Sequence, residues 1–190
     1  MQKSKLMIIK IALLLASLFA LTSCGFPPSN ESLVEKYTSD PKGYEELAEM
    51  IEHDAGKNDY FVVGEGMIGN YWEYQGKWSR SGGAFNKADI NISLPEVLTR
   101  VGLSSQRYAD YMQLFEKTGS ERVTFYKGNS TPSPVVNILV FRSGTTMGGW
   151  FATISRRKDG ITPKDENSRC CSTKNTKIRD GWYLSMQTES

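Results

Sequence analysis

The chain has 190 residues, of which 39% are hydrophobic and 23% are charged, and its formal net charge is +2. This length favours one domain with a substantial core and argues against two. A charge so close to zero gives no indication of nucleic-acid binding, and we expect no nucleic-acid partner.

The first 23 residues have the layout of a secretory signal peptide. They combine a basic start (Lys3, Lys5 and Lys10), an apolar run over residues 11–21 and small residues before Cys24. A membrane-spanning helix needs about 20 apolar residues to cross ~30 Å of hydrocarbon. Lys10 interrupts the only candidate stretch, so we expect residues 1–23 to be cleaved off rather than to span the membrane.

The end of this leader, Leu21-Thr22-Ser23-Cys24, resembles the lipobox of bacterial lipoprotein precursors. The resemblance covers the leader and Cys24 only. It implies a thioether-linked diacylglycerol on Cys24, a palmitate-type lipid anchor, and hence a membrane as the first partner. Because Gly25 and not aspartate follows the cysteine, it implies the periplasmic side of the outer membrane if the cell has two membranes. An ordinary signal peptide with an incidental cysteine is the alternative.

The mature chain is expected to have two parts. Residues 24–39 are predicted to be the lipidated cysteine and a tether, since Pro27 and Pro28 favour an extended backbone. Within this part, residues 31–37 can form a short, separate turn of helix. Residues 40–190 are predicted to be one domain. Three basic residues leave with the leader, so 20 basic and 21 acidic residues remain.

Three helices are predicted from capping residues and apolar spacing. Asp40-Pro41 starts the first, which ends near residues 54–56. Ser93 and Glu96 form a capping box at the start of a short helix running to about residue 101. Ser104 or Ser105 starts another, which Gly119 ends.

Alternating apolar and polar residues predict the strands. An aromatic hairpin over residues 71–80 follows a short run at 60–64, and further strands are expected at 122–126, 135–142, 149–156 and 181–187. We therefore predict an α+β fold with a mainly antiparallel sheet of about four to six strands and two or three helices packed on one face.

The aromatic hairpin is the first candidate binding surface. Trp72 and Tyr74 should share one side of their strand, with Tyr71 and Glu73 on the other. One side can be core, while the other presents rings to solvent or to a partner. The candidate residues are Tyr71, Trp72, Tyr74 and Trp78.

A basic segment is the second candidate surface. Arg156, Arg157 and Lys158 begin a run of cationic residues that brackets the cysteine pair in what we expect to be a long loop. Residues 120–190 carry 11 basic and 6 acidic residues, whereas residues 24–119 carry 9 and 15. Such a loop can contact an anionic envelope surface, or it can be a solvated insertion.

Cys170 and Cys171 are a possible redox pair in an oxidising compartment. Adjacent Cα atoms lie about 3.80 Å apart, closer than disulfides usually require, so a bond between them would be strained. Two free thiols and pairing with a second chain are the alternatives. We expect no metal site, because zinc needs about four ligands and His53 is the only histidine.

No recognised catalytic set is present in the sequence. His53 lies alone beside acidic neighbours, and Glu65 and Glu73 are the best carboxylate pair available. We therefore expect no cofactor and a non-enzymatic role in binding an envelope protein or an anionic envelope polymer. The alternative is an envelope hydrolase acting on cell-wall glycan or peptide, with Glu65 or Glu73 as acid or base.

Overall fold

The computed structural model describes residues 27–80, 90–128, 133–145 and 148–189. The predicted leader and Cys24 lie outside this part of the chain.

The described residues form helices and strands in an α+β arrangement. The helices are α2 (Asn30–Ser39), α3 (Pro41–Ala55), α4 (Leu94–Val101) and α5 (Ser105–Thr118). The strands are β1 (Tyr60–Gly64), β2 (Met67–Ile68), β3 (Tyr71–Tyr74), β4 (Lys77–Arg80), β5 (Arg122–Tyr126), β6 (Val135–Thr145), β7 (Gly148–Arg157), β8 (Glu166–Asn167), β9 (Cys171–Arg179) and β10 (Trp182–Glu189).

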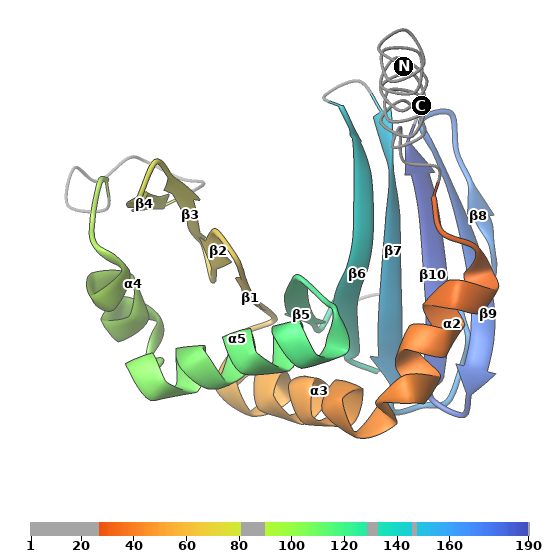
Figure 1. Cartoon of the computed structure of the whole chain (residues 1–190), viewed down its shortest axis with the longest axis horizontal. Helices are drawn as coiled ribbons and strands as arrows, with labels where there is room; N and C mark the ends of the chain where they lie inside the picture. The colour runs from red at the N-terminus through yellow and green to blue at the C-terminus, as the bar shows by residue number, and fades with distance from the viewer. Residues whose placement is uncertain (1–26, 81–89, 129–132, 146–147, 190) are drawn as a thin grey trace, which may run out of the picture.

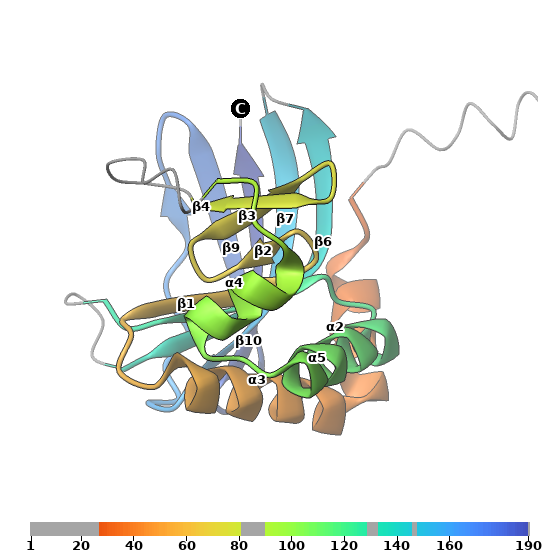
Figure 2. The ribbon, with the colours of Figure 1, turned by 90° about the vertical axis from the view of Figure 1, so that its left-hand side faces the viewer.

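All these strands belong to one antiparallel sheet with the order β4-β3-β2-β1-β5-β6-β7-β10-β9-β8. The sheet is bent into two arms that rise from a base of β1 and β5 (Figure 1). We call β2, β3 and β4 the short arm, and β6 to β10 the long arm. Seen from the side of the short arm, β3 and β4 cross in front of the long arm at a steep angle (Figure 2).

The helices pack on one face of this sheet. Helices α3 and α5 lie below the base, and α4 lies outside the short arm (Figure 1). A continuous core joins buried residues of the helices, such as Leu47 and Tyr111, to residues of the strands, such as Val63, Ile138 and Leu184. Each fully buried aliphatic side chain stabilises the fold by about 1.5–3 kcal/mol, so this face provides most of the driving force for folding.

The strand and helix numbers correct the expectation from sequence. The described residues form a sheet of ten strands rather than four to six, and four helices rather than two or three. Three of the strands, β2, β8 and β9, lie in segments where the sequence predicted none. Two of them, β2 and β8, have only two residues each, too few to show an alternating pattern.

The third of these strands, β9, replaces most of the long loop that we expected around the cysteine pair. Its side chains are half-buried or exposed and almost all polar. A strand without an apolar face carries no alternation of hydrophobicity, so the sequence pattern resembled a loop. Pairing with β10 along its whole length holds it in the sheet.

The helix boundaries follow the capping residues. The Asp40 side chain accepts a hydrogen bond from Gly43 N at 3.2 Å, and Ser104 Oγ accepts one from Arg107 N at 3.0 Å. Gly119 ends α5 in the left-handed region with φ 63°. Ser93 caps α4 without a side-chain hydrogen bond, so the reciprocal capping expected with Glu96 does not form.

Part of the expected tether belongs to the folded domain. Ser29 caps α2 by accepting a hydrogen bond from Ser32 N at 3.2 Å. Leu33 and Tyr37 of α2 are buried, and the ring centroids of Tyr37 and Trp182 in β10 lie 5.1 Å apart. Helix α2 therefore packs on the core, within the segment that was expected to be a tether.

Candidate binding site

The aromatic hairpin divides its rings between the two faces of the sheet. Tyr71 and Trp78 are 7% and 5% exposed and belong to the core, whereas Trp72 and Tyr74 are 52% and 75% exposed. The turn at Gln75-Gly76 has φ values of 50° and 75°, the conformation that matches the twist of a two-residue hairpin. Strand alternation then sends neighbouring rings to opposite sides.

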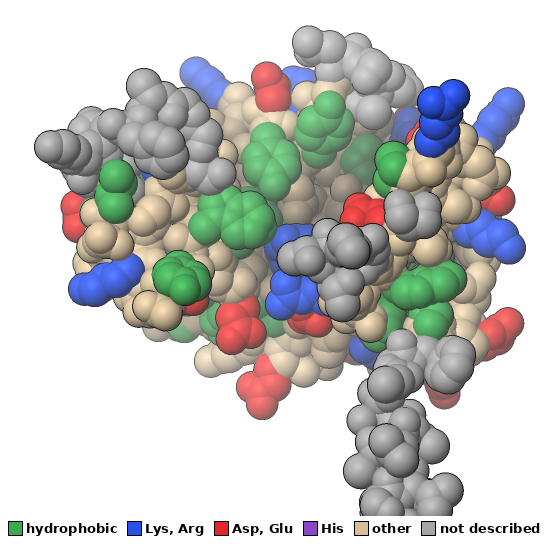
Figure 3. All heavy atoms as spheres, turned by 90° about the horizontal axis from the view of Figure 1, so that it is seen from above, with side chains coloured by type: hydrophobic (Ala, Val, Ile, Leu, Met, Phe, Trp, Pro, Cys, Tyr) green, Lys and Arg blue, Asp and Glu red, His purple; other side chains and the backbone are tan. Residues whose placement is uncertain are grey.

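The face that carries Trp72 continues across the sheet. Residues that pair directly across neighbouring strands lie on the same face of a sheet. This pairing leads from Trp72 on β3 through Met67 on β2, Gly64 on β1 and Arg122 on β5 to Leu139 on β6. We call this side, opposite the helix-packed core, the open face. Seen from above it is hollowed, with hydrophobic side chains on the wall nearest the short arm and basic and acidic side chains toward the middle (Figure 3).

Polar side chains form the long-arm wall of the open face. Ser155 Oγ donates to Asn137 Oδ1 at 2.7 Å, and Ser185 Oγ donates to Asn175 Oδ1 at 2.7 Å. Thr153 Oγ1 and Ser155 Oγ lie 3.2 Å apart. The bonds link β6 to β7 and β9 to β10, so they hold hydroxyl and amide groups in fixed positions on this wall.

The upper rim of the long arm contains a cavity of about 410 Å³ lined by Arg142, Ser143, Gly144, Gly149 and Phe151. Arg142 Nε lies 2.7 Å from Glu121 Oε2, and both side chains are exposed. Exposed ion pairs of this kind are worth about 0–1 kcal/mol, so either partner can turn to a ligand at little cost.

The basic candidates Arg156, Arg157 and Lys158 lie at the end of strand β7 and just after it. The Arg156 side chain is buried between Glu45 Oε1 at 3.1 Å and Glu52 Oε1 at 2.8 Å. Arg157 is also buried and pairs with Asp159.

Lys158 is exposed and its Nζ lies 2.6 Å from Glu52 Oε2. The three cations that sequence reasoning grouped as one surface thus each contact a carboxylate.

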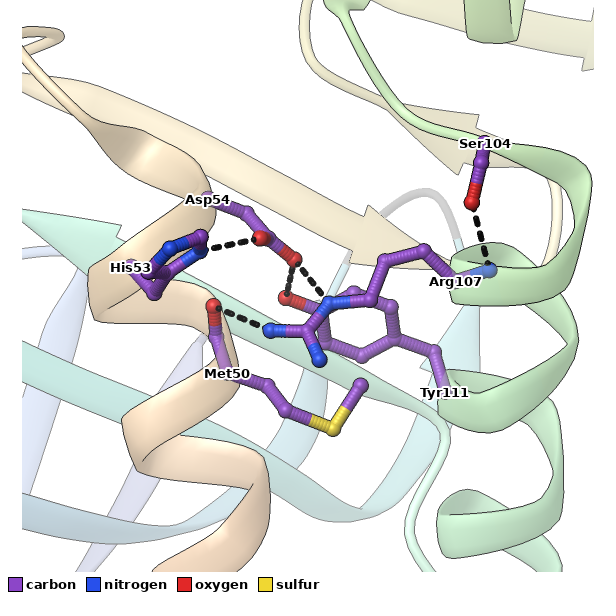
Figure 4. A network of polar contacts seen from close by, with 6 residues as sticks. All are labelled: Met50, His53, Asp54, Ser104, Arg107 and Tyr111. Atoms are coloured by element: carbon purple, nitrogen blue, oxygen red, sulfur yellow. Dashed lines mark hydrogen bonds and ion pairs between the residues drawn. The ribbon is translucent and has the colours of Figure 1, made fainter.

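His53 belongs to a polar network between α3 and α5 (Figure 4). Its Nδ1 lies 2.9 Å from Asp54 Oδ1, while Arg107 Nε and Tyr111 OH donate to Asp54 Oδ2 at 2.7 and 2.8 Å. Arg107 Nη2 also donates to Met50 O at 3.4 Å. The Asp54 side chain is 7% exposed, so the network joins the two helices through a buried carboxylate.

The protonation of this network favours a structural role. Burial by itself raises the pKa of Asp54, but hydrogen bonds from Arg107, His53 and Tyr111 outweigh it and hold that pKa below its ordinary value. Burial raises the pKa of Tyr111, and its bond to Asp54 raises it further. Asp54 therefore stays ionised and paired. No serine, threonine or cysteine lines the cavity beside His53 among the described residues.

The carboxylate candidates are both exposed. Neither Glu65 nor Glu73 lines the four cavities that are bordered by His53, Arg142, Arg156 and Tyr71 in the described part of the chain. The Glu73 carboxylate accepts a hydrogen bond from Gly76 N within the hairpin turn. This contact gives Glu73 a role in the turn.

Cys170 and Cys171 lie at the tight turn between β8 and β9, with their Sγ atoms 2.9 Å apart. Ser168 N donates to Cys171 O at 2.8 Å, which closes the turn. Hydrogen bonds from Cys171 and Ser168 lower the pKa of Cys170, whereas the contact with Cys170 raises that of Cys171. Of the two thiols, Cys170 is the more readily ionised.

Arg122, Asn137 and Ser185, which the bent sheet brings to the open face, were not among the candidate residues predicted from sequence. The one local indication was that Arg122 alternates with the apolar residues Val123 and Phe125, which places it on the polar side of its strand. The order of the strands, which the sequence does not show, was needed to bring it near Trp72.

Among residues 27–80, 90–128, 133–145 and 148–189, no helix is long and apolar enough to cross a membrane. Within the same ranges no three histidine, cysteine or acidic side chains gather where they could hold a metal ion. Comparison with family models, curated proteins and solved structures finds no match to this chain.

Proposed function

We propose that this chain is a lipid-anchored cell-envelope protein that binds an envelope polymer on its open face and catalyses no reaction. Lipid on Cys24 would hold it at the membrane, on the periplasmic side of the outer membrane in a cell with two membranes. The domain beyond the anchor would then present the open face to the polymers of the envelope.

The exposure of Trp72 and Tyr74 is the observation that carries this proposal. Leaving a large ring in water forgoes about 1.5–3 kcal/mol that its burial would contribute. The adjacent rings, Tyr71 and Trp78, are buried on the helix-packed face, where α4 packs on the strand that carries Trp78, so the chain buries aromatic area where a helix covers the sheet. Two exposed rings side by side on a hollowed face are typical of a binding surface.

The chemistry of the open face favours a glycan over a protein. Rings on the short arm offer flat apolar surfaces on which sugars stack, and the long-arm wall presents hydroxyl and amide groups of Asn137, Thr153 and Ser185. A protein interface of ordinary stability has a more apolar centre than this wall provides.

Co-sedimentation of the full-length protein, kept in mild detergent, with purified peptidoglycan sacculi tests the proposal. We expect the wild type to pellet with sacculi and Trp72→Ala to remain largely in the supernatant. Ile161→Ala is the matched control, because Ile161 is equally exposed at 54% but lies outside the open face. Equal pelleting of all three proteins, or no pelleting of the wild type, would overturn the proposal.

The same samples examine the hydrolase alternative. Soluble fragments released from sacculi by the wild type, and not by Glu65→Gln or Glu73→Gln, would replace binding by catalysis as the function.

The anchor is tested separately by membrane fractionation. We expect Cys24→Ser to move the protein from the membrane to the soluble fraction, since stable anchoring needs the acyl chains that the cysteine would carry. Unchanged fractionation, or mass spectrometry that finds Cys24 without lipid in the processed protein, would contradict lipid anchoring.

A further inference from the structure

Arg122 lies at the base of the open face, where the two arms meet. Its register partners are Gly64 on β1 and Leu139 on β6. Its side chain crosses Gly64, because a Cβ atom built on that glycine would lie 2.8 Å from Arg122 Cβ and 2.9 Å from its Cγ. The absence of a side chain at Gly64 thus lets the arginine lie flat toward the short arm.

The guanidinium group of Arg122 ends beside an apolar residue. Its Nη1 lies 3.9 Å from Met67 Sδ, and a thioether sulfur is only a weak acceptor. Burial lowers the pKa of Arg122; Tyr60 and Glu121 raise it and the charge of Arg142 lowers it, and the outcome is a pKa below the ordinary value. The lowered pKa means that the cation is less stable at this position than in water.

Other arginines of the sheet and helices differ from Arg122 because they pair with carboxylates. Arg107, Arg142 and Arg156 each lie within 3.1 Å of a carboxylate oxygen. Among the described residues Arg122 has no such carboxylate contact. A half-buried guanidinium without a carboxylate, at the floor of a hollow, is a ready site for an anion.

We propose that Arg122 binds the carboxylate of an acidic sugar within the polymer on the open face. This inference rests on the proposed function and adds the chemical class of the ligand. A carboxylate fits the planar guanidinium through two parallel hydrogen bonds. A single negative charge also fits the local balance, because Arg142 is already compensated by Glu121 and only one positive charge is left over.

The guanidinium group of Arg122 extends toward the exposed rings. It lies beside Met67 on β2, and the register partner of Met67 on β3 is Trp72. Neighbouring strands lie about 4.8 Å apart. An acidic sugar held by Arg122 is therefore close to the strand that carries Trp72, so one polymer chain can contact both groups.

Calorimetric titration of the full-length protein in detergent with oligogalacturonate, and with a neutral galactose oligomer of the same length, tests this inference. We expect the wild type to bind the acidic oligomer more tightly, with affinity that falls as salt is added. Arg122→Gln should weaken binding of the acidic oligomer by about 10- to 100-fold, the range for a charge-assisted hydrogen bond, and leave the neutral oligomer unaffected. Arg122→Lys should recover part of the loss.

Arg169→Gln, which removes the same charge from the turn between β8 and β9, should bind as the wild type does. Equal affinity of wild type and Arg122→Gln for the acidic oligomer would overturn the inference. If the inference about Arg122 fails in this way but the neutral oligomer binds and Trp72→Ala abolishes that binding, the proposed glycan binding still stands. If a phosphorylated sugar binds through Arg122 more tightly than the uronic acid, the carboxylate assignment is wrong.

Discussion

The two faces of the sheet differ in the burial of their tryptophans and in the partners of their arginines. On the helix-packed face Trp78 is buried against α4, while on the open face Trp72 of the paired strand is half exposed. Arg156 is enclosed by two glutamates of α3, while the Arg122 guanidinium lies beside a methionine sulfur and makes no ion pair with a carboxylate of the described residues. The helix-packed face thus covers its rings and pairs its buried arginine with carboxylates, whereas the open face leaves rings and a cation available.

This contrast separates residues that stabilise the fold from residues that are free to bind. Substitutions on the helix-packed face should lower stability, while equivalent substitutions on the open face should lower binding and leave stability almost unchanged. Each face therefore supplies a matched control for the other.

The two tryptophans of the hairpin should show the largest difference. Trp78→Ala is expected to lower the free energy of unfolding by about 3–5 kcal/mol, because it leaves a cavity in the core. Trp72→Ala should lower it by less than about 1 kcal/mol, since surface substitutions are usually within that range. Urea denaturation followed by circular dichroism measures both. Similar losses would show that the faces do not differ as described.

Arg156 and Arg122 should show the second-largest difference in their contributions to stability. Arg156→Ala is expected to cost about 2–3 kcal/mol of stability, because it leaves Glu45 and Glu52 without their shared cation. Arg122→Ala removes no carboxylate contact and is expected to cost less than about 1 kcal/mol in the same denaturation assay. A larger loss with Arg122→Ala than with Arg156→Ala would reverse the assignment of roles.

Asp54 should link stability to acid pH. Its pKa is depressed in the folded state, so its contribution is fully present above the unfolded value of about 3.9 and is lost as pH falls through the folded value. Asp54→Asn should therefore lower stability by about 1–3 kcal/mol at neutral pH and flatten its decline below about pH 4. Parallel pH profiles of wild type and variant would indicate that Asp54 is not the linked group.

The turn that carries Cys170 and Cys171 should have the smallest effect on stability. In the reduced protein Cys170 is expected to react with iodoacetamide before Cys171, because the pKa of Cys170 is lowered and that of Cys171 is raised. Peptide mass spectrometry after brief alkylation measures the order. A bond between the two thiols closes too small a ring to change stability much, so oxidation should barely move the denaturation midpoint. Preferential labelling of Cys171 would contradict the geometry of the turn.

The helix-packed face was largely predictable from sequence. Asp40, Ser104 and Gly119 act within one or two turns of the chain, so their capping roles can be read locally. The hairpin at residues 71–80 was predictable for the same reason, since alternation and the Gln75-Gly76 turn specify it. The expected division of Trp72 and Tyr71 between opposite faces also follows from alternation alone.

The open face was not predictable because it depends on contacts between distant strands. Arg122 becomes a floor residue only when β1 and β6 flank β5 and Gly64 leaves space for its side chain. Arg156 looked like part of a basic surface because the glutamates that enclose it lie more than 100 residues earlier. Strand β9 has no apolar face, and only its pairing with β10 reveals it.

The indole N–H resonances of the four tryptophans provide the most direct test that the open face is the binding surface. The full-length protein labelled with ¹⁵N-tryptophan would be titrated with soluble peptidoglycan fragments. We expect the Trp72 resonance to shift in proportion to occupancy, while those of Trp78 and Trp182, both buried in the core, stay in place. Binding with shifts at Trp78 or Trp182 and none at Trp72 would show that the open face is not the binding surface.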